Sequence, residues 1–150
     1  IASVDLTQYI GRCRVVDVRG EGTPSLIPAH ALTDELLRGA ERVLFRTRTD
    51  HDHRTWNPGF AAVGPAAARA LVRAGIRLVG IDTPSMDHAD SKDLGGHHVL
   101  HDGGIAILEN LDLRAVPAGD YELIALPLRI VNGDSSPVRA ILRELPASRP

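Results

Sequence analysis

Residues 76–87 have the sequence Ile-Arg-Leu-Val-Gly-Ile-Asp-Thr-Pro-Ser-Met-Asp, an apolar run followed by a polar turn. The nearly continuous apolar run 76–81 is typical of a strand that is buried on both faces. Pro84 cannot donate a ladder hydrogen bond and restricts Thr83, so the strand is expected to end there. Polar groups just past the carboxyl end of a buried strand are a common site arrangement in α/β sheets. The segment therefore predicts a buried strand with a candidate site at its end.

A helix is predicted directly before this strand. Pro65 suits a first helical position, residues 66–74 favour helix propagation, and Gly75 suits the stop. Residues 42–47 are typical of an earlier strand. Strand, helix and apolar strand in this order predict a βαβ unit with a right-handed crossover.

The remaining segments complete an α/β pattern. Residues 13–18 predict a strand, and Pro28 opens a short helix that Gly39 stops. A second short helix is predicted from a cap at Asp90 or Ser91 through His101. Three further strands are expected at 105–111, at 121–130 with an interruption at Pro127, and at 136–142 as a closing edge. The sequence thus predicts about six strands and three helices in one domain, residues 1–150.

Composition excludes several classes of partner. The 17 Lys and Arg residues against 19 Asp and Glu residues give a formal charge of −2, without the basic excess of nucleic-acid binders. Aromatic residues are 3% of the chain, which argues against stacking platforms for bases. No apolar run approaches the roughly 18 residues of a membrane span. The single Cys13 cannot form an intrachain disulfide and fits a reducing, cytoplasmic compartment.

Histidines and one carboxylate form the main candidate for chemistry. His97 and His101 are four residues apart, so a helix would place them on one face, beside His98. Glu109 is the only charged residue between Ile105 and Leu111. A carboxylate in such an apolar segment is expensive to bury unless it is paired, and a metal ion would pair it. The alternative is that Glu109 faces solvent and the histidines are ordinary surface residues.

Other residues carry weaker signals. The run His51-Asp52-His53 could bind a metal or be a solvated polar loop. Turn residues such as Asp87 and His88 are expected to be structural, because Asp and Ser bond their own backbone. Ser85 lacks the Gly-x-Ser-x-Gly elbow of a nucleophile, and Cys13 within a strand fits a small buried hydrophobe.

The segment Leu-Val-Gly-Ile-Asp-Thr-Pro-Ser-Met-Asp, residues 78–87, resembles the signature of bacterial kynurenine formamidases in the cyclase family of metal-dependent hydrolases. The resemblance covers most of residues 56–143 and, more thinly, the first 48. Its further motifs are Trp-Asn-Pro-Gly-Phe at 56–60, Asp-Ser-Lys at 90–92, the His97-His98 pair, and the segments 104–111, 116–128 and 136–140.

This resemblance implies a swivelling β/β/α domain with a mixed sheet, few helices and a site for one or two divalent ions. The ions would be Zn²⁺, with Mn²⁺ in some members. The implied reaction is hydrolysis of N-formyl-L-kynurenine to L-kynurenine and formate in tryptophan degradation. The later metal ligands of the family fall on His97 and Glu109. Together with the helix-then-strand pattern, this predicts that the two side chains point toward each other from the end of the short helix and the middle of the next strand. His98 and His101 have no ligand role in the family.

One family motif does not occur in this chain. The early motif His-x-Gly-Thr-His-x-Asp-x-Pro-x-His would supply the main metal ligands and the proton-transfer histidine. We therefore expect the chain to correspond to a family member without its N-terminal part, so the catalytic residues stay unassigned. Trp56 and Phe60 are candidates for an apolar wall against the aryl ring of the substrate.

Two other functions remain open. One is hydrolysis of a different cyclic or aryl amide, such as isatin. The other is a non-catalytic binding domain that keeps the fold without the site. The expected partner is a small-molecule substrate rather than a nucleic acid or membrane, in a homo-oligomer, a dimer or tetramer.

Overall fold

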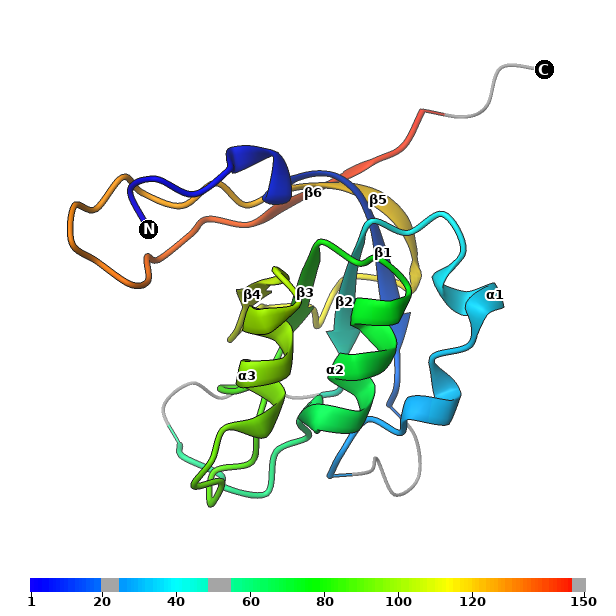
Figure 1. Cartoon of the computed structure of the whole chain (residues 1–150). Helices are drawn as coiled ribbons and strands as arrows, with labels where there is room; N and C mark the ends of the chain where they lie inside the picture. The colour runs from blue at the N-terminus through cyan, green and yellow to red at the C-terminus, as the bar shows by residue number, and fades with distance from the viewer. Residues whose placement is uncertain (20–24, 49–54, 147–150) are drawn as a thin grey trace.

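The computed structural model describes residues 1–19, 25–48 and 55–146 (Figure 1). Within these residues, six strands form one mixed sheet in the order β4-β3-β2-β1-β5-β6. The strands are β1 (Ile10–Asp17), β2 (Arg42–Arg46), β3 (Leu78–Ile81), β4 (Ala106–Leu108), β5 (Gly119–Ile124) and β6 (Ile141–Glu144). Strands β1 to β4 run parallel to one another, whereas β5 is antiparallel to both β1 and β6.

The α-helices are α1 (Asp34–Leu37), α2 (Gly64–Arg73) and α3 (Gly95–Asp102), and two 3-10 turns are η1 (Leu6–Gln8) and η2 (Ala29–Ala31). Strands β1 to β4 follow one another in the sheet in chain order. Right-handed crossovers between such strands place every connecting helix on the same face. Figure 1 shows α2 and α3 side by side over that face.

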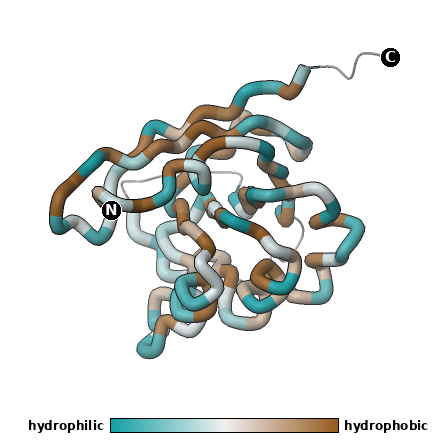
Figure 2. Tube along the Cα trace, turned by 45° about the horizontal axis from the view of Figure 1, so that its top comes forward, coloured by the Kyte–Doolittle hydropathy of each residue, from teal (hydrophilic) through white to brown (hydrophobic). Residues whose placement is uncertain are grey.

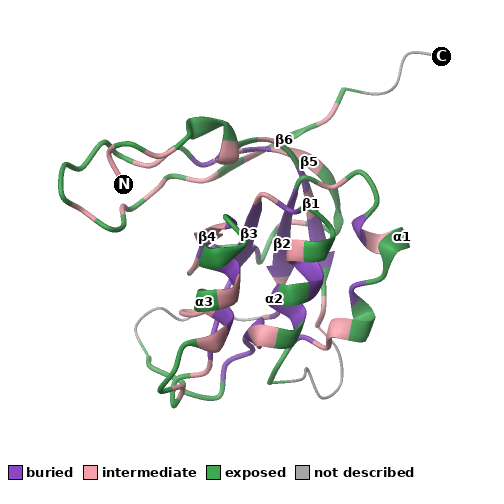
Figure 3. Cartoon of the chain, in the orientation of Figure 1, coloured by how far each residue is buried: buried purple, intermediate pink, exposed green. Residues whose placement is uncertain are grey.

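Both faces of the sheet carry apolar side chains, as the continuous apolar run of β3 predicts. On the helix-covered face, Phe45 of β2, Val79 of β3 and Leu71 of α2 are fully buried. On the opposite face the core contains Leu44, Leu78, Leu108 and Leu123, with the loop residues Leu111 and Leu113 packed against them. Alternate residues of β1 to β4 therefore enter opposite cores. Figure 3 shows β2 and β3 buried and β6 largely exposed.

Residues 125–140 leave the sheet as an extended arm between β5 and β6 (Figure 1). The N-terminus lies against it, since the Ile1 ammonium donates to the carbonyl of Gly133. Figure 2 shows hydrophobic stretches along this arm, and Leu128 and Val131 are exposed on it. The predicted strand 121–130 therefore ends at Ile124, and the predicted closing strand begins at Ile141 rather than 136. Pro127 and Pro137, which lack an N–H, lie in the stretches that are not strand.

Two predicted helices have different bounds. The segment after Pro28 forms η2 and then α1, because the Thr33 hydroxyl accepts from the Leu36 N–H at 3.1 Å and begins a second helix. The second predicted helix begins at Gly95 rather than after Asp90 or Ser91.

The predicted α/β class with a mixed sheet and few helices is confirmed. No helix of the described residues is long and apolar enough to cross a membrane.

Candidate metal site at the carboxyl edge of the sheet

The candidate site lies where β3 and β4 end. Carboxyl ends of neighbouring parallel strands meet at one edge of a sheet. Glu109 comes directly after β4, and Met86 and Asp87 belong to the turn after β3. His97 is the third residue of α3, which connects the two strands. The polar turn after the apolar strand is therefore part of the site.

The backbone after β4 determines where Glu109 lies. Asn110 has a φ of 57°, a left-handed conformation that Asn tolerates better than most residues. The Asn110 N–H donates to the Thr83 carbonyl at 2.9 Å, which fixes this turn against the end of β3. Glu109 Oε1 then accepts from the Met86 N–H at 2.8 Å. The Met86 N–H and the turn at Asn110 together hold the carboxylate of Glu109 at the end of β4.

His97 and Glu109 face each other, as the helix-then-strand pattern and the family resemblance together predict. His97 Nε2 lies 3.2 Å from Glu109 Oε1, and the two side chains are 30% and 28% exposed. Two details of the prediction are wrong: His97 lies in the first turn of α3 rather than at its end, and Glu109 lies just beyond β4 rather than in its middle. The helix begins three or four residues later than a cap at Asp90 or Ser91 predicts, so His97 lies near its start.

Asp87 is the site residue that the sequence analysis missed. Its Oδ2 lies 2.7 Å from His97 Nδ1, and its carboxylate also accepts from the N–H groups of Gly96 at 2.7 Å and His97 at 2.9 Å. Burial raises the pKa of Asp87, but the hydrogen bonds from His97 and Gly96 together outweigh it and lower the pKa. The turn pattern indicated only a structural role for Asp87. No sequence pattern shows that the ring of His97, ten residues later, contacts this carboxylate.

An open cavity of about 600 Å³ adjoins the site. His97, His101 and Glu109 contribute to its lining, together with the apolar Ile107 and Val138. His98 is exposed and is not part of this lining. Trp56 and Phe60 form an edge-to-face pair with ring centroids 5.7 Å apart, but neither lines this cavity. His51, Asp52 and His53 lie outside the described residues.

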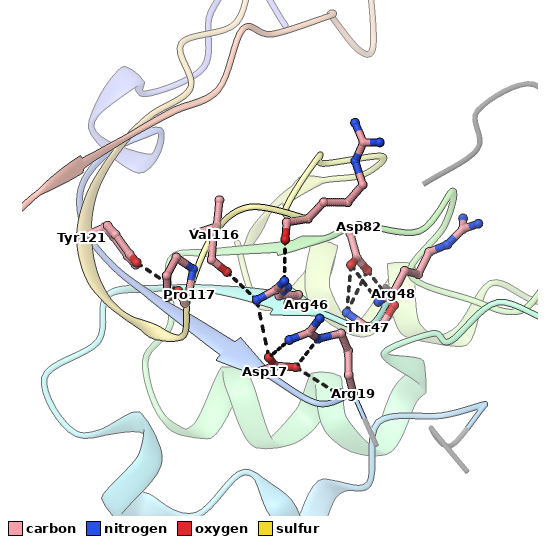
Figure 4. Close-up of polar contacts among 10 residues, drawn as sticks. Asp17, Arg19, Arg46, Thr47, Arg48, Asp82, Val116, Pro117 and Tyr121 are labelled. Carbon is pink, nitrogen blue, oxygen red and sulfur yellow. Dashed lines mark hydrogen bonds and ion pairs between the residues drawn. The ribbon is translucent and has the colours of Figure 1, made fainter. Parts of the chain in front are cut away.

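The neighbouring part of the same sheet edge is braced by a different carboxylate (Figure 4). Asp82 is buried and accepts from the Thr47 N–H, from the Thr47 hydroxyl at 2.6 Å and from the Arg48 N–H at 3.0 Å. Arg46 donates to the Val116 carbonyl at 2.9 Å and lies 3.6 Å from Asp17. These contacts tie the ends of β1, β2 and β3 together, so the edge that carries the candidate site is rigid.

Residues 1–88, more than half of the chain, match the model of the Cyclase family, described as "Putative cyclase". The chain belongs to the Cyclase family. Among solved structures, it is similar to "The Structure Of Potential Metal-Dependent Hydrolase With Cyclase Activity", with 28% identity and a TM-score of 0.74 over 95% of this chain and 69% of that one.

Two further structures resemble this Cyclase-family chain. A predicted metal-dependent hydrolase from Bacillus stearothermophilus is 28% identical, with a TM-score of 0.71 over 93% of this chain and 66% of that one. An isatin hydrolase bound to the product analogue thioisatinate is 24% identical, with a TM-score of 0.75 over 93% and 62%. This last likeness shows the fold alone. The Cyclase-family chain spans about two thirds of the length of the structures that it matches.

The geometry of this Cyclase-family chain fits part of a metal site. Two ligands of one tetrahedral Zn²⁺, each about 2 Å from it, are roughly 3.4 Å apart. His97 Nε2 and Glu109 Oε1, 3.2 Å apart, fit that spacing. Imidazole and carboxylate are also donors that Zn²⁺ and Mn²⁺ accept. Among residues 1–19, 25–48 and 55–146, no group of three or more His, Cys, Asp or Glu side chains could hold an ion, so His97 and Glu109 would form only part of a metal site.

Proposed function

We propose that the protein is a metal-dependent amide hydrolase and that His97 and Glu109 are two ligands of its divalent ion. The observation that carries this proposal is the contact of 3.2 Å between His97 Nε2 and Glu109 Oε1 at the rim of an open cavity. Family membership supports it, as does the likeness to two structures named metal-dependent hydrolases. Further ligands would come from outside the part of the chain that the structure describes.

The substrate that we propose is N-formyl-L-kynurenine, which the enzyme would split into L-kynurenine and formate. The support for this choice is the resemblance of segment 78–87 to the kynurenine formamidase signature, a segment that also contributes Met86 and Asp87 to the site. The ion would be Zn²⁺ or Mn²⁺, one or two per site. When bound, such an ion supplies Lewis acidity that polarises the amide carbonyl and activates water.

The side chains of this chain have separate roles in that reaction. His97 presents Nε2 to the ion while Nδ1 is bonded to Asp87. Glu109 supplies negative charge, and the Met86 N–H holds its carboxylate in place. The apolar side chains of Ile107 and Val138 offer a wall for the nonpolar part of a substrate. The expected proton-transfer histidine belongs to the early motif that this sequence lacks, so no residue here is assigned to proton transfer.

The decisive experiment measures metal content and turnover on the complete gene product. Stoichiometric Zn²⁺ or Mn²⁺ together with hydrolysis of N-formylkynurenine supports the proposal. Turnover of isatin without turnover of N-formylkynurenine would place the protein with the alternative substrate class. Metal-free protein with no hydrolysis of either amide would favour the non-catalytic binding domain. His97→Ala is the test variant and His98→Ala its control, because His98 is exposed and lies outside the cavity lining.

A homo-oligomer in the cytoplasm remains part of the proposal. Light scattering coupled to size-exclusion chromatography of the complete protein tests the assembly state. A monomer at working concentration would contradict it.

A further inference from the structure

The carboxylate of Asp87 is in contact with both the backbone and the side chain of the candidate ligand. The side chain of Asp87 is 5% exposed. One oxygen, Oδ1, accepts from the Gly96 N–H at 2.7 Å. The other, Oδ2, accepts from the His97 N–H at 2.9 Å and lies 2.7 Å from His97 Nδ1. Asp87 Oδ2 therefore bridges the backbone N–H and the ring Nδ1 of His97, which orients the ring relative to its own backbone.

This contact determines which ring nitrogen carries the proton. Both oxygens of Asp87 accept backbone N–H groups, one from Gly96 and one from His97, so the carboxylate presents an acceptor to His97 Nδ1. A neutral imidazole has one N–H, so a short contact at Nδ1 requires that this nitrogen be the donor. The unprotonated Nε2 then faces Glu109 Oε1 at 3.2 Å.

Two acceptors that face each other repel unless a proton or a cation lies between them. A metal ion bound between Nε2 and Glu109 Oε1 would contact both, and their 3.2 Å separation fits such a position. Metal-ligating histidines commonly donate their other ring N–H to a carboxylate, which fixes both tautomer and ring orientation.

We propose that Asp87 is a positioning residue that holds His97 as the Nδ1–H tautomer and aims Nε2 at the ion-binding position. This inference rests on the proposed function, because it assigns Asp87 a role toward the ion of that site. It departs from the sequence-based interpretation of Asp87 as a turn residue only.

A purely structural role for Asp87 is the competing explanation, since it also caps the N-terminus of α3 through Gly96 and His97. The chain offers a matched control for that role. The Ser91 hydroxyl accepts from the Leu94 N–H at 3.2 Å at the same end of α3, and it makes no contact with His97. Ser91→Ala therefore removes a hydrogen bond at the start of the helix and leaves the His97 ring untouched.

The test compares Asp87→Ala with Ser91→Ala. Side-chain ¹⁵N–¹H correlation spectra of the metal-free protein, at a pH where imidazoles are neutral, report the tautomer of His97 directly. We expect Nδ1–H in the unmodified protein and in Ser91→Ala, and a shift toward Nε2–H in Asp87→Ala. Titration with Zn²⁺ alone is expected to show a 10- to 100-fold loss of affinity in Asp87→Ala and less than a twofold loss in Ser91→Ala.

Three results would overturn the inference: Nε2–H in the unmodified protein, the same tautomer in both variants, or equal losses of Zn²⁺ affinity in both. The first needs no variant, so it holds even if Asp87→Ala does not fold. Asp87→Asn, which keeps one acceptor oxygen for the helix cap, provides a second comparison. A protein with the expected tautomer and Zn²⁺ affinities that hydrolyses no amide would refute the proposed function but leave the role of Asp87 standing.

Discussion

The Met86 N–H donates to Glu109 Oε1 at 2.8 Å across the ends of β3 and β4. This bond links the turn of the signature segment to the candidate metal ligand, 23 residues later in the chain. It means that Glu109 is neither a free surface carboxylate nor an unpaired buried one. The bond also lets the carboxylate keep its position before an ion binds.

Replacement of Glu109 by alanine in the complete protein is expected to lower Zn²⁺ affinity and turnover by a large factor. Stability should fall by only about 0.5–1.5 kcal/mol, the contribution of the hydrogen bond to Met86. His101→Ala is the control, because His101 lines the same cavity at the far end of α3. Metal content, turnover and urea denaturation are measured on both variants. An inactive His101→Ala beside an active Glu109→Ala would reverse the assignment.

The 150-residue chain by itself is expected to show little or no hydrolase activity. The described residues provide two ligands, whereas catalytic zinc sites usually have three from the protein. Purified chain is assayed with N-formylkynurenine and added Zn²⁺. Turnover comparable to that of a complete family member would show that the catalytic groups lie within these 150 residues.

Asp82→Ala is expected to destabilise the fold by at least about 3 kcal/mol. The substitution leaves the Thr47 N–H, the Thr47 hydroxyl and the Arg48 N–H without their acceptor, and each buried donor that loses its partner costs about 1–3 kcal/mol. Asp134→Ala removes an exposed carboxylate on the arm and should change stability by less than about 0.5 kcal/mol. Equal effects of the two variants on urea unfolding would contradict the bracing role of Asp82.

Gly80→Ala is expected to cost about 1–3 kcal/mol through overpacking. A Cβ at this position in β3 would lie 2.4 Å from Leu44 Cδ2 and 2.7 Å from Leu111 Cδ1. Gly95→Ala is the matched control, because its Cβ would meet Pro65 at an ordinary 3.5 Å and alanine favours the helix. Thermal unfolding should show a lower midpoint for Gly80→Ala and an unchanged or higher one for Gly95→Ala.

The ion pair of Arg14 with Asp120 predicts part of the acid sensitivity. The hydrogen bonds from the Arg14 guanidinium, at 2.6 and 2.8 Å, lower the pKa of Asp120 in the folded protein. A carboxyl whose folded pKa is lowered stabilises the fold above its unfolded pKa of about 3.9, and this stabilisation is lost as the pH falls through the folded value. Asp120→Asn should therefore reduce the loss of stability between about pH 5 and pH 3. The change is small because Asp120 is 42% exposed.

Denaturation at several pH values checks this expectation. Asp93→Asn, also an exposed carboxylate but outside any ion pair that involves Arg14, serves as the control. An identical pH dependence for Asp120→Asn and the unmodified protein would show that the pair contributes nothing measurable.

Local sequence patterns predicted the βαβ unit of β2, α2 and β3. The apolar run at 76–81 identified β3, because a strand buried on both faces has no polar alternation. Pro65 suits the first turn of α2 through its fixed φ, and Gly75 follows its end at a positive φ of 71° that glycine tolerates. The helix-then-strand pattern at 90–111, together with the family resemblance, then predicted that His97 and Glu109 face each other.

The tertiary structure decided what the sequence left open. The start of α3 depends on Asp87, a capping partner eight residues before Gly95, and no local pattern reveals a cap at that distance. The arm at 125–140 depends on packing of Val138 and Ala140 against the core cluster that Val4 also packs against, which joins opposite ends of the chain. The role of Asp87 depends on a 2.7 Å contact with His97 that exists only once the helix has packed against the turn. Hydrogen-bond geometry is set by where the packed elements bring each atom, and residue spacing alone does not contain it.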